Sequence, residues 1–100
     1  MTEKIKLGSF YETKCGLVAE VRTTDHNGVR PVVATVRHPA GSEDPDKKGA
    51  FYKNAVKQNR DFDLYGREYV GPDAGDSPYD FVREVGKPAD WDEIPNPDVL

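Results

Sequence analysis

The residues best suited to catalysis or metal binding in this chain are one cysteine, Cys15, and two histidines, His26 and His38. A metal site needs three or four ligands at suitable spacing, and no CxxC, HxH or HExxH pattern connects these residues. A lone cysteine at the start of a strand is more often a small buried apolar residue than a nucleophile. The motifs of phosphate-binding loops and serine hydrolases are also missing from the sequence. We therefore expect no metal, no cofactor and no enzymatic activity.

Acidic residues gather in three short stretches, at residues 43–46, 61–63 and 90–93. Acid–base catalysis needs two carboxyl groups whose surroundings separate their pKa values. These stretches fall in a predicted loop, on the outer side of a predicted strand and near the C-terminus, where water would surround them. A solvated surface therefore explains them without catalysis.

Basic and aromatic residues are interleaved between residues 47 and 69. In single-strand nucleic-acid binders, cations follow the phosphates and aromatic rings stack on the bases, each stack being worth ~1–3 kcal/mol. The other interpretation places these aromatic rings in the core, because the chain is poor in leucine and isoleucine. The candidate nucleic-acid-binding residues are Lys47, Lys48, Tyr52, Lys53, Lys57, Arg60, Tyr65 and Arg67.

The C-terminal stretch combines acidic residues with two large apolar ones, a format typical of partner-binding segments. Tryptophan is enriched at interface hot spots, and the stretch resembles in composition the acidic C-terminal tails of bacterial single-stranded-DNA-binding proteins. Those tails end in an aspartate run with an apolar tip, whereas this chain ends Pro-Asp-Val-Leu. The alternative is that Trp91 and Ile94 fold back onto the sheet and complete a thin core. The candidate partner-binding residues are Asp90, Trp91, Asp92, Glu93 and Ile94.

Negative charge is concentrated in the same part of the chain. The net charge is −4, and residues 71–100 hold two Lys or Arg residues against eight Asp or Glu residues. The sequence pI is about 5.1, whereas generic nucleic-acid binders usually have a pI above ~9. The distribution favours a protein partner over direct binding of a polyanion.

Length and composition predict one small domain over residues 1–86, followed by a mobile acidic tail over residues 87–100. The chain has 100 residues, of which 36 % are hydrophobic. No apolar run approaches the ~20 residues of a membrane helix, and the N-terminus has no apolar signal region. We therefore expect a cytoplasmic protein without membrane contact, and a homodimer is compatible with the short edge strands.

Valine outnumbers leucine and isoleucine, which favours strands over helices. Alternating apolar residues predict strands at 4–10, 17–22, 29–37 and 61–70, and Asn27-Gly28 predicts a hairpin between the second and third. A short helix is expected at 50–59 from apolar pairs four residues apart. Another is expected at 79–85, where a fifth strand is the alternative. The fold class is thus β-rich α+β: an antiparallel sheet of four to five strands, or a small open barrel, with one or two short helices.

Two functions fit these features better than the third alternative, a small enzyme that would use Cys15, a histidine and a carboxylate. The first is a non-enzymatic accessory protein of phage or mobile-element type, acting as an inhibitor or DNA mimic that presents its acidic C-terminal surface to a protein partner, such as a nucleic-acid-handling protein. The second is a single-stranded nucleic-acid-binding protein that uses residues 47–69 and is regulated by its acidic tail.

Overall fold

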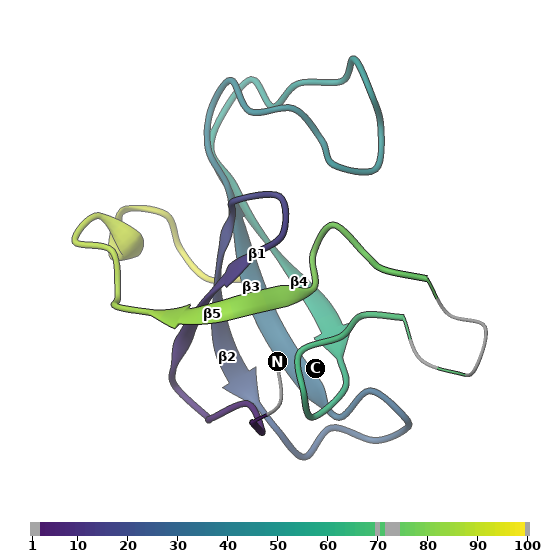
Figure 1. Ribbon diagram of the computed structural model, residues 1–100. Helices are drawn as coiled ribbons and strands as arrows, with labels where there is room; N and C mark the ends of the chain where they lie inside the picture. The colour runs from purple at the N-terminus through teal and green to yellow at the C-terminus, as the bar shows by residue number, and fades with distance from the viewer. Residues whose placement is uncertain (1–2, 70, 72–74, 100) are drawn as a thin grey trace.

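The chain folds into one five-stranded antiparallel sheet with almost no helix (Figure 1). The computed structural model describes residues 3–69, 71 and 75–99. In chain order the elements are β1 (Phe10–Thr13), β2 (Val18–Thr23), β3 (Val32–His38), β4 (Val56–Phe62), β5 (Phe81–Val85) and the 3-10 turn η1 (Trp91–Glu93). The spatial order of the strands is β4-β3-β2-β1-β5.

The inner strands of the sheet are β3, β2 and β1, and the alternating valines of β2 and β3 had predicted strands there. β3 is buried along almost its whole length and pairs with β4 from Val32↔Phe62 to His38↔Val56. The hairpin predicted around Asn27-Gly28 is confirmed, since β2 and β3 are antiparallel neighbours. Its loop is longer than a two-residue turn, because the last β2–β3 pair is Thr23↔Val33.

The sheet curls so that its two end strands approach each other over the core. β4 and β5 are at opposite ends of the strand order, yet the rings of Phe62 and Phe81 lie 4.5 Å apart between centroids. Tyr11 of β1 stacks on Phe81 at 5.0 Å. In Figure 1, β5 crosses in front of the central strands. We call this side, with its aromatic and valine cluster, the inner face.

The helix predicted at 50–59 is wrong. Residues 56–62 form β4, and Phe51 makes only an isolated bridge with Glu43. The apolar residues of this stretch do not share one buried helical stripe: Phe51 is 65 % exposed, whereas Tyr52 stacks on His38. Seven consecutive pairings with β3 stabilise the extended form instead.

The helix predicted at 79–85 is also wrong, and the alternative of a fifth strand is confirmed. The Ser77-Pro78 signal marks a tight turn rather than a helix start. The Ser77 carbonyl accepts the Asp80 N–H at 3.1 Å, and the Asp80 carboxylate accepts the Ser77 N–H at 3.1 Å. This turn places β5 beside β1, with which it pairs in antiparallel fashion.

The boundaries of the first and fourth predicted strands are wrong. β1 begins at Phe10, the residue at which the first predicted strand was expected to end, while Ile5 is buried without belonging to a strand. The strand predicted at 61–70 begins earlier and ends at Phe62, because Asp63 accepts the N–H groups of Tyr65 and Arg67 in a turn. Gly66 in this turn has φ of 82°, and a Cβ there would lie 2.7 Å from the Phe81 ring. Val70 and residues 72–74 lie outside the described residues.

The prediction of a mobile tail after residue 86 is not confirmed. Trp91 is completely buried, and residues 90–98 make hydrogen bonds to side chains of β2, β3 and β4. We call residues 87–99 the C-terminal segment, and the side of the sheet that it covers the outer face. Within the described part of the chain, no helix is long and apolar enough to span a membrane.

Candidate protein-binding site

The C-terminal segment is fixed to the outer face through Trp91. Its ring meets Phe10 of β1 edge-on, with 5.1 Å between ring centroids. The indole N–H donates to Glu20 Oε1 at 3.0 Å, so the polar atom of the buried ring has a partner. The alternative interpretation of the sequence, in which Trp91 folds back onto the sheet, matches this placement.

Polar side chains of the sheet hold the backbone on both sides of Trp91. Lys57 Nζ lies 4.1 Å from the centre of the Trp91 ring and donates to the Trp91 carbonyl at 2.6 Å and to Asn96 Oδ1 at 2.8 Å. Arg22 donates to the Pro97 carbonyl at 3.1 Å. Burial of the ammonium lowers the pKa of Lys57 below its ordinary value of 10.5. These bonds keep the segment in one position on the sheet.

A groove of about 380 Å³ lies between the fixed segment and the loop that joins β3 to β4. One wall consists of residues at the two ends of that loop, and the other consists of residues around η1. Small and apolar side chains form much of the lining, and charged groups stand among them. The lining residues are Arg37, Pro39, Ala40, Ala55, Asp90, Glu93 and Ile94.

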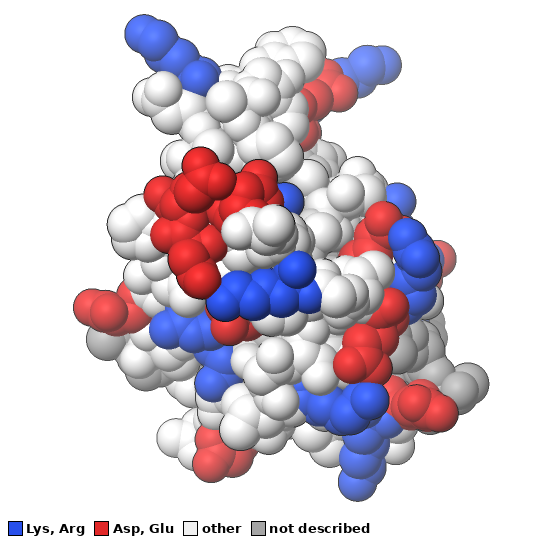
Figure 2. Space-filling view, turned by 90° about the vertical axis from the view of Figure 1, so that its left-hand side faces the viewer, with Lys and Arg blue, Asp and Glu red and all other residues white. Residues whose placement is uncertain are grey.

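Two of the three carboxylates around the groove are paired with basic side chains. Arg37 donates to Asp90 at 2.8 Å, and this hydrogen bond and the positive charge hold the pKa of Asp90 below its ordinary value. Asp92 pairs with Lys87 at 2.8 Å, which lowers the pKa of Asp92 in the same way. Glu93 is exposed and makes no ion pair with another described residue. Figure 2 faces this side of the molecule and shows acidic side chains gathered beside basic ones.

The structure divides the five predicted partner-binding residues into two roles. Asp90, Glu93 and Ile94 line the groove, while Asp92 is exposed on η1. Trp91 is buried and anchors the other four. Sequence reasoning missed the opposite wall, which is Arg37, Pro39, Ala40 and Ala55. No local pattern marks those residues, because only the pairing of β3 with β4 brings Ala55 beside Pro39.

The predicted nucleic-acid-binding residues do not form one surface. Lys57 is buried on the outer face under the C-terminal segment. Arg60 is on the inner face, 3.8 Å above the Tyr79 ring, because alternate residues of a strand point to opposite faces. Tyr52 stacks on His38, and Tyr65 is in the turn after β4. The remaining residues, Lys47, Lys48, Lys53 and Arg67, are exposed in loops.

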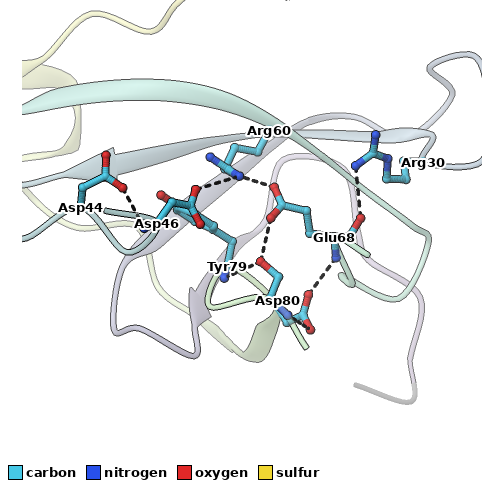
Figure 3. Close-up of polar contacts among 8 residues, drawn as sticks. Arg30, Asp44, Asp46, Arg60, Glu68, Tyr79 and Asp80 are labelled. Atoms are coloured by element: carbon cyan, nitrogen blue, oxygen red, sulfur yellow. Dashed lines mark hydrogen bonds and ion pairs between the residues drawn. The ribbon is translucent and has the colours of Figure 1, made fainter. Parts of the chain in front are cut away.

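A second polar cluster lies at the edge of the inner face, and its residues bond to one another (Figure 3). Arg60 pairs with Glu68, whose other oxygen accepts the Ser77 hydroxyl at 2.7 Å. Asp80 accepts the N–H groups of Glu68 at 2.8 Å and Ser77 at 3.1 Å. The buried charges and hydroxyl thus satisfy one another, which is the arrangement expected of a structural network.

The described residues offer no assembled metal centre. No group of three His, Cys, Asp or Glu residues among them could hold a metal ion. Cys15 is exposed, and its Sγ contacts the Thr13 hydroxyl at 3.2 Å rather than a histidine. Comparisons with family models, with curated proteins and with solved structures give no match. The groove is therefore the site from which function is inferred.

Proposed function

We propose that this protein is a non-enzymatic protein-binding module that holds a basic, partly apolar segment of a partner protein in the groove beside η1. The observation that carries the proposal is the groove itself, whose lining combines small and apolar side chains with the Arg37–Asp90 pair and the carboxylate of Glu93. An aliphatic side chain of the partner would bury its surface against Pro39, Ala55 and Ile94. A neighbouring lysine or arginine would meet Glu93.

The fixed walls also favour binding. A segment that is ordered only on binding loses conformational entropy, which weakens affinity. Here Trp91 already holds the η1 wall in place. The acidic rim would speed the approach of a basic partner, and this effect would fall with salt because the screening length is about 8 Å at physiological ionic strength.

The proposal is tested with a short peptide that alternates lysine and leucine, compared with a matched peptide that alternates glutamate and leucine. Amide shifts in NMR spectra should change around Arg37, Ala40, Ala55 and Glu93 with the lysine peptide, and should not change with the glutamate peptide. Glu93→Gln should weaken binding about two- to five-fold, as expected for a partly exposed ion pair. Glu3→Gln removes an exposed carboxylate that does not line the groove and serves as the matched control.

Results of two kinds, from the peptides and from DNA, would contradict the proposal. One is equal binding of the two peptides, or shifts confined to residues away from the groove. The other is salt-sensitive binding of labelled single-stranded DNA that is unaffected by Glu93→Gln, which would favour a nucleic-acid ligand.

A further inference from the structure

His38, the last residue of β3, is buried without any hydrogen-bond partner. Its side chain has no exposed surface, and neither Nδ1 nor Nε2 has a hydrogen-bond partner. A buried polar atom without a partner lowers stability, because it has lost the hydrogen bonds that water supplies in the unfolded chain. The cost would be higher for the imidazolium, which carries an N–H donor on each nitrogen and a positive charge. The site thus accepts neutral histidine and disfavours the protonated form.

Tyr52 is one of two aromatic side chains that pack on the His38 imidazole. Its ring stacks on the His38 ring, with 4.4 Å between centroids and 25° between planes. Tyr52 belongs to the β3–β4 loop (residues 39–55), which projects beyond the end of the sheet in Figure 1. Its backbone pairs across the loop, donating to the Ser42 carbonyl at 2.9 Å and accepting the Gly41 N–H at 2.7 Å. The His38–Tyr52 stack therefore fastens the loop to the end of the sheet.

The same loop provides one wall of the groove. Pro39 and Ala40 directly follow His38, and Ala55 precedes Val56, the β4 residue that pairs with His38. Any movement that separates Tyr52 from His38 would be transmitted to this wall through the loop backbone. The groove wall and the His38 site thus both depend on the position of the β3–β4 loop.

The charged and titratable groups around His38 come from three segments. The β3–β4 loop contributes Asp44 and Asp46 with Tyr52, and β4 contributes Arg60. Tyr79, from the turn before β5, meets the imidazole edge-on at 5.9 Å. Burial lowers the pKa of His38 below its ordinary value of 6.5 and Arg60 adds to this effect, while Asp44, Asp46 and the neighbouring Gln58 side chain oppose it. Burial is the largest of these effects.

We propose that protonation of His38 releases Tyr52 and loosens the β3–β4 loop, so that mild acidification disorders one wall of the groove. The imidazolium needs hydrogen-bond acceptors, and water can reach both nitrogens only when the Tyr52 ring moves away. Weaker capture of a partner at low pH rests on the function proposed above. The release of the loop does not, because it is a property of the protein alone.

The sign of the pH dependence follows from proton binding. An unfolded or open chain binds the proton near pH 6.5, whereas the closed form binds it only at lower pH. Between these two pKa values the open form holds more protons, so the closed form loses stability as the pH falls through this window. Above the ordinary histidine pKa the contribution of His38 to stability is constant.

NMR titration of the full chain from about pH 8 to about pH 5 covers the ordinary histidine range. The His38 imidazole and the amides of Gly41, Ser42 and Tyr52 should change with one midpoint, below that of an exposed histidine. His26→Asn removes the other imidazole and assigns the signal. Tyr52→Ala should expose His38 and move its midpoint up toward 6.5, while Tyr52→Phe keeps the ring and should retain the low midpoint.

His38→Phe supplies an aromatic ring that cannot titrate, and its loop amides should stay constant over the same range. The proposal is overturned if those amides still change with the same midpoint, because Asp44 or Asp46 would then be responsible. It is also overturned if His38 titrates in the unmodified protein while the loop amides do not move. If His38→Phe does not fold, the comparison of Tyr52→Ala with Tyr52→Phe decides, and an unchanged His38 midpoint in both would equally overturn it. None of these measurements uses a partner, so the two proposals can fail separately.

Discussion

The two faces of the sheet are covered by different kinds of contact. On the inner face, aromatic rings and valines pack together, as Phe62 and Phe81 do at 4.5 Å. On the outer face, one buried tryptophan donates to Glu20, and Arg22 and Lys57 donate to backbone carbonyls of the C-terminal segment. Apolar burial is insensitive to direction, whereas these polar contacts each require a defined position. The outer face therefore gains a rigid segment that carries carboxylates, which an apolar cover could not present.

The largest expected effects on stability come from removing one buried ring on each face of the sheet. Phe62→Ala and Trp91→Ala each remove a fully buried ring, and each should lower the free energy of unfolding by about 3–5 kcal/mol. Phe62→Ala should lower amide protection throughout the sheet, because its ring joins β4 to β5. Trp91→Ala should lower protection first in residues 91–98 while β2–β4 stay protected. Urea unfolding followed by circular dichroism, together with hydrogen exchange, measures both effects.

Trp91→Phe is the matched control, since it keeps a buried ring but loses the indole N–H bond to Glu20. It should be destabilised less than Trp91→Ala and should keep the C-terminal segment in place. If Trp91→Ala lowered amide protection in β2–β4 as much as in residues 91–98, the contrast between the two faces would be wrong. The C-terminal segment would then unfold together with the core.

The inner face could be predicted from sequence because its signal is local. Alternating valines in β2 and β3 identified the central hairpin, and Asn27-Gly28 marked its turn. The errors arose where a local pattern had two structural solutions. The apolar pairs at 50–59 fit a helix, but β4 forms there because β3 provides a seven-residue partner. Ser77-Pro78 fits a helix start, but Asp80 caps the N–H of Ser77 and makes a turn.

The candidate site could be predicted only on one side. Acidic and apolar residues at 90–94 carry a compositional signal, and three of them line the groove. The position of Trp91 depends on partners such as Glu20, which is 71 residues away in the chain. Periodicity carries no information on such contacts, so burial and exposure of the tryptophan were equally compatible with the sequence. The groove wall formed by Pro39 and Ala55 could not be predicted for the same reason.

An intermediate effect is expected for the polar contacts of the outer face. Lys57→Met keeps an unbranched chain against the Trp91 ring but removes the donors to the Trp91 carbonyl and Asn96. We expect a loss of about 1.5–3 kcal/mol, less than for Trp91→Ala. A net hydrogen bond to a charged group is worth about 1.5–3 kcal/mol, but the apolar contact remains and the variant has no buried ammonium to desolvate. Urea unfolding followed by Trp91 fluorescence measures it. Lys53→Met, at an exposed loop position, is the control, and its free energy of unfolding should stay within about 0.5 kcal/mol of that of the unmodified protein. Similar losses in the two variants would show that Lys57 has no special role.

The smallest effect on stability is expected for the exposed acidic residues of the C-terminal segment. Asp92 is 75 % exposed and pairs with Lys87, which is 52 % exposed, and solvent-exposed ion pairs of this kind often contribute nothing measurable to folding. Asp92→Asn should therefore leave the urea midpoint unchanged, yet it should weaken the lysine–leucine peptide at low salt and not at high salt, because only the electrostatic attraction is lost. A lower urea midpoint with unchanged peptide binding would assign this carboxylate to folding. The expected outcome assigns the Asp92 carboxylate to recognition. Two sets of residues on the outer face would then have different roles: buried Trp91 and Lys57 fix the C-terminal segment, and exposed carboxylates that stability does not require attract the partner.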